Sequence, residues 1–487
     1  MEFIIAIIYS LSLLFLFLFS LGQLHLTWLY LKAKKKENKI ADAPAHFKPH
    51  VSVQLPVYNE KYVIQRLIEA VSKIDYPKEK LEIQVLDDST DETTKIAQVK
   101  IEQLQQEGLN IQLIRRPERK DFKAGALDYG LQTAKGEFIA IFDADFLPQA
   151  DFLIKTIPHF ADESIGVVQT RWAHINKEYS LFTKLQAFGL DAHFSIEQSG
   201  RNFAGSFINF NGTCGVWRKK CIEDAGGWSA DTLTEDLDLS YRAQLKGWKF
   251  KYLEEVSTPG ELPVIMPSIK SQQYRWNKGA AETARKLMRN VFNSDKSFKN
   301  KVHAFFHLLN SSVFLFLLMA AVLSIPMLWF KQNHPWLELI FDAGLIFLLG
   351  FFSITIYFFV ASKMAFGNNI LKNFLKYYPV FLIVSMGLSL HNGIAVLEGW
   401  LGIKTPFIRT PKFNISKKGE SWQGNEYLDF KFSWLNLLEV LGSLYFVIGI
   451  AMGFYFKDPV LLLFHAMLAI GFGIVAWQSI KVSRHAR

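Results

Sequence analysis

The sequence predicts a doubly wound, mostly parallel α/β domain joined to an α-helical transmembrane region. Two observations carry this prediction. Between residues 45 and 297, short apolar strands alternate with segments of helical periodicity, as they do in parallel sheets with crossover helices. Outside that part, the chain contains several uncharged runs that are long enough for a helix to cross the ~30 Å hydrocarbon core of a bilayer.

The α/β elements are predicted from short apolar runs and from helical spacing. Each strand is rich in β-branched residues, and each helix repeats its apolar residues three or four positions apart. Polar motifs follow several of the strands, and doubly wound sheets bind ligands beyond the carboxyl ends of their strands. The predicted elements are strands over Val51–Leu55, Leu81–Leu86, Ile111–Ile114 and Phe138–Phe142, and helices over Tyr62–Val71, from near Asp91 onward, and over Gly125–Thr133.

Apolar segments at both ends of the chain predict membrane-spanning helices. Residues 3–31 carry no charge, and we expect an uncleaved N-terminal anchor over residues 1–33. A cleaved signal peptide fits this sequence less well than an anchor does, because no basic residue precedes the apolar run and a basic cluster follows it. Within an expected C-terminal membrane region, 298–487, further uncharged runs cover residues 304–330, 343–362, 377–397, 440–456 and 459–480.

The net charge of +9 is explained by the flanks of these apolar runs and not by nucleic acid binding. Four lysines lie between residues 32 and 36, after the first run, and Lys481, Arg484 and Arg487 follow the last. Such clusters mark the cytoplasmic side of a membrane. We therefore expect an integral multi-pass protein of the plasma or inner membrane, with residues 45–297 in the cytoplasm and no nucleic acid partner.

The segment 377–397 conflicts with the charge rule. If it crossed the membrane, the basic loop that follows, including Lys404, Lys417 and Lys418, would lie outside. We therefore expect this segment to lie in the membrane plane or to enter only halfway, ending near Trp400. The last two apolar runs then return the basic C-terminus to the cytoplasm.

Asp143-Ala-Asp145 is the pattern that points most directly to chemistry. It follows the predicted strand Phe138–Phe142. Carboxylate oxygens are the ligands that Mg²⁺ and Mn²⁺ prefer, and such an ion can neutralise a diphosphate. Taken alone, the pattern also fits an ordinary strand-end turn with two solvated acids.

Polar residues near two other strand ends fit a nucleotide. Asp87 and Asp88 end the second strand and could hold a ribose or a base edge, although they also fit a helix-capping cluster. Lys123 precedes a helix start made of small residues, where its ammonium and the helix N-terminus could both meet phosphate oxygens. A solvated lysine is the alternative.

Two later motifs add a candidate base and a candidate phosphate ligand. Glu235 and Asp236 open a predicted helix, where a carboxylate could accept a proton from a sugar hydroxyl or simply cap the helix. Gln272, Arg275 and Trp276 share one helix face. Arg275 suits phosphate oxygens, and Trp276 offers a flat face to a sugar. An amphipathic helix on the membrane surface, within residues 268–297, is the alternative.

Taken in this order, the motifs resemble those of the membrane-embedded family 2 glycosyltransferases, the inverting cellulose synthase and hyaluronan synthase type. The run looks most similar to the plant cellulose synthase-like A and C groups, which are mannan and glucan backbone synthases. The segments that carry the resemblance are Val53–Glu60, Leu86–Asp91, Phe122–Leu127, Ile141–Phe146, Val168–Trp172, Phe210–Thr213, Gly215–Arg218, Thr234–Asp238, Gly247–Lys249 and Gln272–Trp276.

The resemblance implies a GT-A-type fold for the cytosolic domain, with interfacial helices toward its end, and a role for each motif. The nucleoside and diphosphate of a donor would lie at the strand ends, and the acceptor would approach from the other side. The implied roles are nucleotide binding for Glu60, Asp87, Asp88, Lys123, Asp143 and Arg275, binding of Mg²⁺ or Mn²⁺ for Asp143 and Asp145, catalytic base for Asp236, and acceptor binding for Asn211, Gly212, Thr213, Glu235, Gln272 and Trp276.

A further similarity lies between the membrane segments. Residues 407–412 (FIRTPK) resemble the gating loop F-x-V-T-x-K of cellulose synthases. Phe407, Thr410 and Lys412 match that pattern, whereas Arg409 replaces its valine. The similarity implies a cytosolic loop over residues 403–433, which agrees with the charge argument.

These implications define an expected function. We expect an inverting, metal-dependent glycosyltransferase that moves a sugar from UDP-glucose or GDP-mannose to a growing β-linked polysaccharide, processively and with export. The expected partners are a nucleotide-sugar donor, a glycan or glycolipid acceptor and the lipid bilayer, and accessory subunits stay open. The alternative is a non-processive transferase that glycosylates a lipid such as ceramide or diacylglycerol. A non-catalytic scaffold or sugar-nucleotide sensor fits the complete set of acidic motifs less well.

Overall fold

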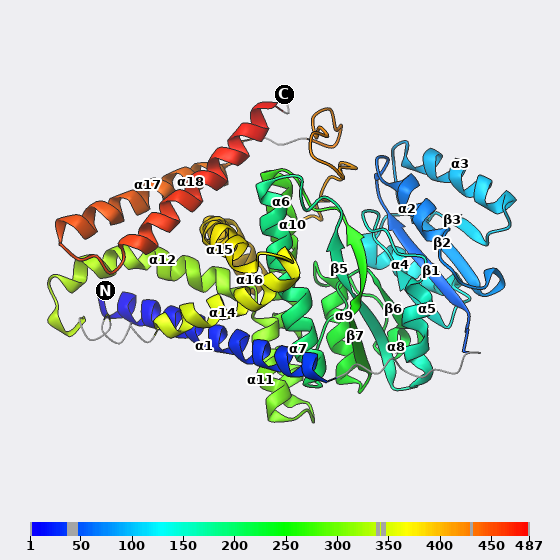
Figure 1. The fold of residues 1–487 in the computed structure, drawn as a ribbon, viewed down its shortest axis with the longest axis horizontal. Coiled ribbons are helices and arrows are strands. Elements are labelled where there is room, and N and C mark those ends of the chain that lie inside the picture. The colour runs from blue at the N-terminus through cyan, green and yellow to red at the C-terminus, as the bar shows by residue number, and fades with distance from the viewer. Residues whose placement is uncertain (1, 37–46, 338–340, 342–346, 429–431, 486–487) are drawn as a thin grey trace.

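The structure, a computed structural model, describes residues 2–36, 47–337, 341, 347–428 and 432–485 of the chain. An α/β domain and a bundle of long helices lie side by side (Figure 1). The segment that follows the helix ending at Leu401 leaves the bundle and returns to the α/β domain. The predicted α/β fold and the predicted long apolar helices are therefore both present.

The α/β domain is built on a seven-stranded sheet in the order β3-β2-β1-β4-β6-β5-β7. Every neighbouring pair is parallel except the two that involve β6, which runs antiparallel to β4 and β5. The predicted doubly wound, mostly parallel sheet is confirmed. The strands are β1 (Val51–Val57), β2 (Leu81–Asp87), β3 (Ile111–Ile114), β4 (Phe138–Ile141), β5 (Ile165–His174), β6 (Gly215–Arg218) and β7 (Lys249–Gly260).

Helices cover both faces of the sheet, and each face contributes apolar residues to a separate core. Alternate residues of β1, from Val51 to Val57, pack with Leu67 and Ile101 in one core. Ile139 and Ile141 of β4 pack with Leu127 in the other. The first core includes α2 (Ile64–Val71), α3 (Thr93–Gln106) and α5 (Phe152–Thr156), and the second includes α4 (Phe122–Thr133), α8 (Lys219–Asp224) and α9 (Glu235–Leu245).

Two predicted boundaries differ from the structure in ways that affect the site. The helix expected from Gly125 begins at Phe122, so Lys123 lies in the first turn of α4 and does not precede the helix. The strand expected to end at Phe142 ends at Ile141. The shift at α4 arises because Asp121, in the left-handed conformation with φ 59°, turns the chain directly into the helix.

A chain of helices connects the sheet to the bundle. The π-helical turn η3 joins α6 to α7, and π-helical turns are frequent at functional sites. These connecting elements are α6 (Leu181–Ala192), η3 (His193–Glu197), α7 (Gln198–Phe203), α10 (Met266–Asn293) and α11 (Phe298–Leu308), with short 3₁₀ turns η1 (Lys78–Lys80), η2 (Ile157–Ala161) and η4 (Pro335–Leu337).

Five helices of the described chain are long and apolar enough to cross a membrane. They match the predicted runs, with one correction: the run 304–330 is divided between α11 and a separate helix that begins at Ser312, because the chain turns after Leu308. The five are α1 (Glu2–Lys35), α12 (Ser312–Lys331), α14 (Phe347–Phe366), α17 (Trp434–Tyr455) and α18 (Leu462–His485).

The segment around residues 377–397 forms two helices that meet at an angle of 49°. They are α15 (Ile370–Gly387) and α16 (Ser389–Leu401), and they break at Leu388. This geometry fits a broken span or a re-entrant loop. The sequence analysis predicted that this segment ends near Trp400, but it did not predict the bend between the two helices. Gly399 lets α16 lie close to α10, since a Cβ there would stand 2.7 Å from the Cβ of Ala281.

Candidate active site

Lys123 forms the centre of a charged cluster at the carboxyl ends of the central strands. Its Nζ lies 2.6 Å from Oδ1 of Asp143 and 3.7 Å from Oε1 of Glu235. It also donates a hydrogen bond of 2.8 Å to the carbonyl oxygen of Gly212. The first turn of α4, the end of β4, the N-terminus of α9 and the turn before β6 therefore meet at one ammonium.

Asp236 lies beside this cluster and carries a raised pKa. Burial and the neighbouring Glu235 carboxylate raise the pKa of Asp236 to about 7, while Lys123 opposes the shift. For Lys123, burial lowers the pKa, but Asp143 and Glu235 outweigh it, so the pKa is raised overall. A carboxylate that titrates near neutral pH is suited to general base catalysis.

The turn at residues 210–213 needs glycine to bring its backbone this close. Gly212 has φ +76°, and a Cβ there would lie 3.1 Å from Oδ2 of Asp236 and 3.4 Å from Nζ of Lys123. Thr213 Oγ1 accepts a hydrogen bond of 2.9 Å from the backbone N–H of Asp143. Asn211 contacts Gln198 and His193 through its side chain, at 2.6 and 3.2 Å. The turn thus connects the carboxylate cluster to η3 and α7.

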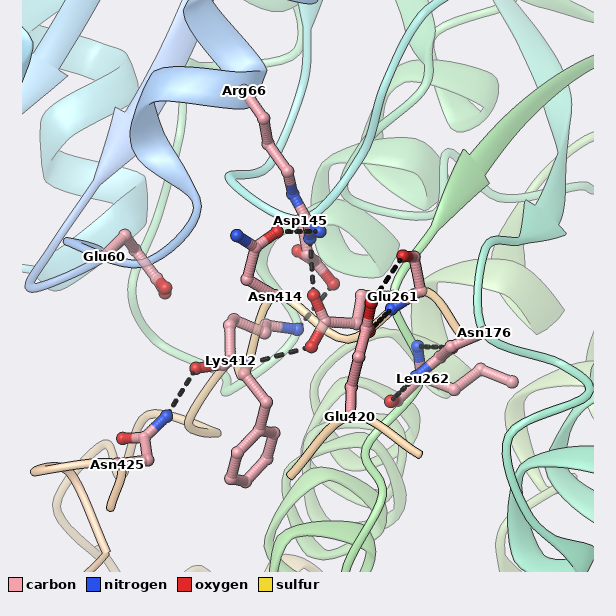
Figure 2. Close-up of polar contacts among 12 residues, drawn as sticks. Glu60, Arg66, Asp145, Asn176, Glu261, Leu262, Lys412, Asn414, Glu420 and Asn425 are labelled. Carbon is pink, nitrogen blue, oxygen red and sulfur yellow. Dashed lines mark hydrogen bonds and ion pairs between the residues drawn. The ribbon is translucent and has the colours of Figure 1, made fainter. Parts of the chain in front are cut away.

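Asp145 faces a different lysine. Nζ of Lys412, from the loop after α16, lies 2.5 Å from its Oδ2 (Figure 2). The two carboxylates of Asp143-Ala-Asp145 therefore pair with separate ammonium groups. Among the described residues, no three His, Cys, Asp or Glu side chains form a group that could hold a metal ion. One or two carboxylates fit Mg²⁺ when substrate phosphates and water complete its shell, so this pair fits a metal bound together with a diphosphate.

Glu60 is a buried carboxylate at the end of β1 that contacts the same loop. Its Oε2 lies 2.9 Å from Nη1 of Arg409. Burial raises the pKa of Glu60 to about 7, although the nearby charges of Arg409 and Lys412 act in the other direction. The residue at which the gating-like motif departs from the cellulose synthase pattern is therefore the one that pairs with Glu60.

Asp87 and Asp88 have different surroundings. Asp87 accepts hydrogen bonds from the backbone N–H of Ser89 at 2.9 Å and from Oγ1 of Thr94 at 2.6 Å, so it organises the entry to α3. Asp88 forms two parallel hydrogen bonds with Arg116, at 2.8 and 2.6 Å. Asp87 also lies 3.6 Å from Nε of Arg115, so both carboxylates at the end of β2 pair with an arginine.

Arg275 contacts the loop, and no carboxylate of the described residues forms an ion pair with it. Its Nη1 donates to the carbonyl oxygen of Ile408 at 2.6 Å and to Oγ1 of Thr410 at 2.8 Å. The guanidinium lies 5.2 Å from the ring centre of Phe407, which stacks on Phe122 at 5.4 Å. Burial lowers the pKa of Arg275 to about 10, and the carboxylates of the site oppose the shift. The three matching positions of the gating-like motif all lie against the site.

Gln272 and Trp276 lie on the same helix as Arg275 and are half-buried. The ring of Trp276 is 6.2 Å from that of Trp172. Both residues are therefore placed on the α10 face that borders β5.

Comparison with known proteins identifies the α/β domain. Residues 49–284 match the profile of the family described as glycosyltransferase like family 2. This part of the chain is a family 2 glycosyltransferase domain. The structure also overlays on the mannosyltransferase PcManGT from Pyrobaculum calidifontis, solved in complex with GDP-Man and Mn²⁺, with a TM-score of 0.52 and 20% sequence identity. The overlay covers 74% of this chain and 99% of the other, and it confirms the GT-A-type fold.

Curated relatives share much of the sequence of the glycosyltransferase domain. The chain is 43% identical over 264 residues to a protein of Oryza sativa subsp. japonica named probable glucomannan 4-beta-mannosyltransferase 11, covering 53% of this chain and 46% of that protein. It is 42% identical over 248 residues to glucomannan 4-beta-mannosyltransferase 1 of Cyamopsis tetragonoloba, covering 50% and 47%. The chain thus spans about half the length of the curated relatives it matches.

The glycosyltransferase domain also holds the loop through residues that the sequence analysis missed. Arg66 binds both Asn414 and Glu261, and Oε1 of Glu261 accepts the backbone N–H of Phe413 at 2.9 Å (Figure 2). Asn425 donates to the carbonyl oxygen of Lys412 at 2.8 Å. No local pattern marks Arg66 or Glu261, because their partners lie more than a hundred residues away in the chain.

Proposed function

We propose that this chain is an inverting β-mannosyltransferase that uses GDP-mannose to extend a 4-β-linked polysaccharide of the glucomannan type. The observation that carries the proposal is the identity of 41–43% between the glycosyltransferase domain and proteins named glucomannan 4-beta-mannosyltransferases. The charged cluster around Lys123 supports it, because it offers a base and cations within one site.

Asp236 is proposed as the general base. Its carboxylate accepts the proton of the acceptor hydroxyl while that oxygen bonds to the anomeric carbon of the donor. The bond between the anomeric carbon and the phosphate oxygen breaks, and its electron pair leaves with the nucleoside diphosphate. One displacement at the opposite face converts an α-linked donor into a β-linked product. The raised pKa of Asp236 suits this role at neutral pH.

Cationic side chains are proposed to stabilise the departing diphosphate. Arg275, Lys123 and Lys412 all lie at the strand ends, and a guanidinium or an ammonium suits phosphate oxygens. Asp143 and Asp145 would hold Mg²⁺ or Mn²⁺, which supplies further positive charge to the leaving group. Asp88 and Glu60 are proposed to face the nucleoside, and Asn211, Trp276 and Gln272 the acceptor end.

The membrane region is proposed to place the glycosyltransferase domain in the cytoplasm and to pass the product outward. The α/β domain and the loop that contacts it must share one side of the membrane. The basic residues that follow α1 and that lie in this loop favour the cytoplasmic side. The proposed division is an anchor over 1–33, the glycosyltransferase domain over 45–297 and a membrane region over 298–487.

A donor panel with product separation tests the proposal. Purified full-length protein in detergent is incubated with Mg²⁺ or Mn²⁺ and radiolabelled GDP-mannose, UDP-glucose or UDP-N-acetylglucosamine, with Asp236→Asn as the control. We expect label from GDP-mannose in a high-molecular-weight product that β-mannanase digests. Label confined to the organic extract would replace the polymer synthase with a glycolipid synthase, and label from another donor would change the sugar.

A further inference from the structure

A cavity of about 240 Å³ lies between α1 and α11, away from the glycosyltransferase site. It is lined by none of the candidate active-site residues. Its walls come from Phe19, Leu26 and Phe306, among others, and its polar groups come from α1, α7 and α11. These three helices meet near the basic end of α1, beside the α/β domain (Figure 1).

Two residues that line this cavity each carry a buried polar atom without a partner among the described residues. Arg201 is 2% exposed and Gln23 is 4% exposed, and both line the cavity. Nη1 of Arg201 pairs with Glu197 at 3.1 Å, but its Nε has no hydrogen-bond acceptor among the described residues. Oε1 of Gln23 likewise has no donor there. A buried donor or acceptor without a partner is destabilising, so a polar ligand that reached these atoms would remove that cost.

The cavity is also electrically positive. Lys299 lies in the first turn of α11, whose N-terminus adds the positive end of the helix dipole. Burial together with the charges of Arg201 and Lys299 lowers the pKa of His303, another lining residue, to about 4. A second hollow of about 470 Å³ continues from Lys299 to three lysines and Trp28 at the end of α1. Both spaces therefore favour an anion.

The positive groups lie at one end of a mostly apolar space, in the place where a membrane helix leaves the bilayer. Phe19 and Leu26 are on the apolar α1, and the lysines that follow mark its interfacial end. A soluble anion would satisfy the charges but leave the apolar walls exposed to water. A lipid satisfies both.

We propose that this cavity binds one lipid with an anionic phosphate headgroup. The phosphate accepts hydrogen bonds from Arg201 and Lys299, a headgroup hydroxyl donates to Gln23, and an acyl chain covers the apolar wall of α1 and α11. Arg201 contacts Glu197, Glu197 contacts His193 at 3.2 Å, and His193 contacts Asn211 at 3.2 Å. The lipid site therefore adjoins the acceptor side of the glycosyltransferase domain through a continuous polar chain.

Native mass spectrometry of the full-length protein tests the site. Delipidated protein in detergent is titrated with phosphatidylglycerol, with phosphatidylcholine of the same acyl chains, and with inorganic phosphate, and the thermal midpoint is followed in parallel. We expect one retained phosphatidylglycerol and a raised midpoint, with neither effect from inorganic phosphate. Lys299→Glu should weaken phosphatidylglycerol retention about tenfold or more, as expected when a charge-assisted hydrogen bond becomes a repulsion.

Lys301→Glu is the matched control, because it makes the same charge change on α11 at a residue that does not line the cavity. We expect this variant to retain phosphatidylglycerol like the wild type. Gln23→Leu, which removes the unpaired acceptor, should fold at least as well as the wild type and still weaken retention. Equal retention of phosphatidylcholine, equal loss in both lysine variants, or protection by inorganic phosphate alone would each overturn the proposal.

Discussion

The two carboxylates of Asp143-Ala-Asp145 pair with lysines from very different parts of the molecule. Lys123, on Asp143, belongs to α4 and is held inside the domain by Gly212 and Glu235. Lys412, on Asp145, comes from the loop that follows α16, almost three hundred residues later in the chain. The first half of the site is therefore built by the sheet and its crossover helices, whereas the second half exists only while the loop is docked.

With the proposed roles, this difference separates the chemical step from the binding of the donor. The docked loop contacts Arg275, Glu60 and Asp145, which are proposed to bind the diphosphate, the nucleoside and the metal of the donor. Within the described residues, the charged groups around Lys123 and Asp236 form no ion pair with the loop, and only the neighbouring Phe122 contacts it, at Phe407. Changes near Lys123 should therefore alter the chemical step, and changes in the loop should alter donor binding.

The largest effect is expected from Asp236→Asn. The amide keeps the size of the side chain but cannot accept the proton, so kcat should fall by about 10²- to 10⁴-fold with the glycan acceptor. Glu235→Gln, one residue away in the same helix turn, serves as the matched control and should lose far less. Equal losses in the two variants would remove Asp236 from the role of base.

The next largest effects are expected from Lys123→Met and Lys412→Met, which test whether the two halves of the site are independent. Lys123→Met should lower both the thermal midpoint and kcat, because it leaves a partly buried carboxylate cluster without its cation. Lys412→Met should weaken the docking of the loop, and it should also lower the midpoint, because it leaves the buried carboxylate of Asp145 without its cation. Trypsin cleavage at the exposed Lys417 and Lys418 measures the release of the loop.

We expect faster cleavage in Lys412→Met and an unchanged rate in Lys123→Met. If both variants were cleaved at the same rate, the two halves of the site would not be independent, and the comparison would fail.

A third prediction concerns pH. The base must be ionised, so kcat/KM should fall about tenfold per unit as the pH drops below about 7, the pKa of Asp236. Glu235 raises that pKa and Lys123 lowers it, so Glu235→Gln should move the acidic limb to lower pH and Lys123→Met to higher pH. If the acidic limb of the pH profile stayed at the same pH in both variants, it would reflect the ionisation of a group other than Asp236.

The same raised pKa has a consequence for stability. An aspartate ionises near ~3.9 in the unfolded chain, so the folded protein holds this proton more tightly. The stabilisation of the folded protein by this bound proton is complete below pH ~3.9 and is lost as the pH rises through about 7. The thermal midpoint of Asp236→Asn, relative to the wild type, should therefore increase between pH 5 and pH 8.

The sequence predicted the first half of the site far better than the second. Local apolar patterns predicted the strands β1 to β4 but not their order in the sheet, and the carboxyl ends of parallel strands bring Asp88, Lys123 and Asp143 to one edge. The contacts of Arg409, Arg66 and Glu261 could not be predicted, because they depend on where the membrane helices return the loop. The bend between α15 and α16 likewise depends on packing against α10, at Gly399.

The smallest effect is expected at Arg409, where this chain departs from the gating motif. Arg409→Val removes the partner of the buried Glu60, and since Arg409 lowers the pKa of Glu60, that pKa should rise further. Glu60 is then protonated at neutral pH, and we expect the KM for the donor to change only a few fold, with little change in kcat, because the ion pair contacts none of the groups around Lys123. A double-mutant cycle with Glu60→Gln checks the cause: Arg409→Val should have no further effect once the carboxylate is gone. An undiminished effect in the Glu60→Gln background would mean that Arg409 acts on the donor through another contact, such as its stacking over the ring of Tyr427 at 4.2 Å.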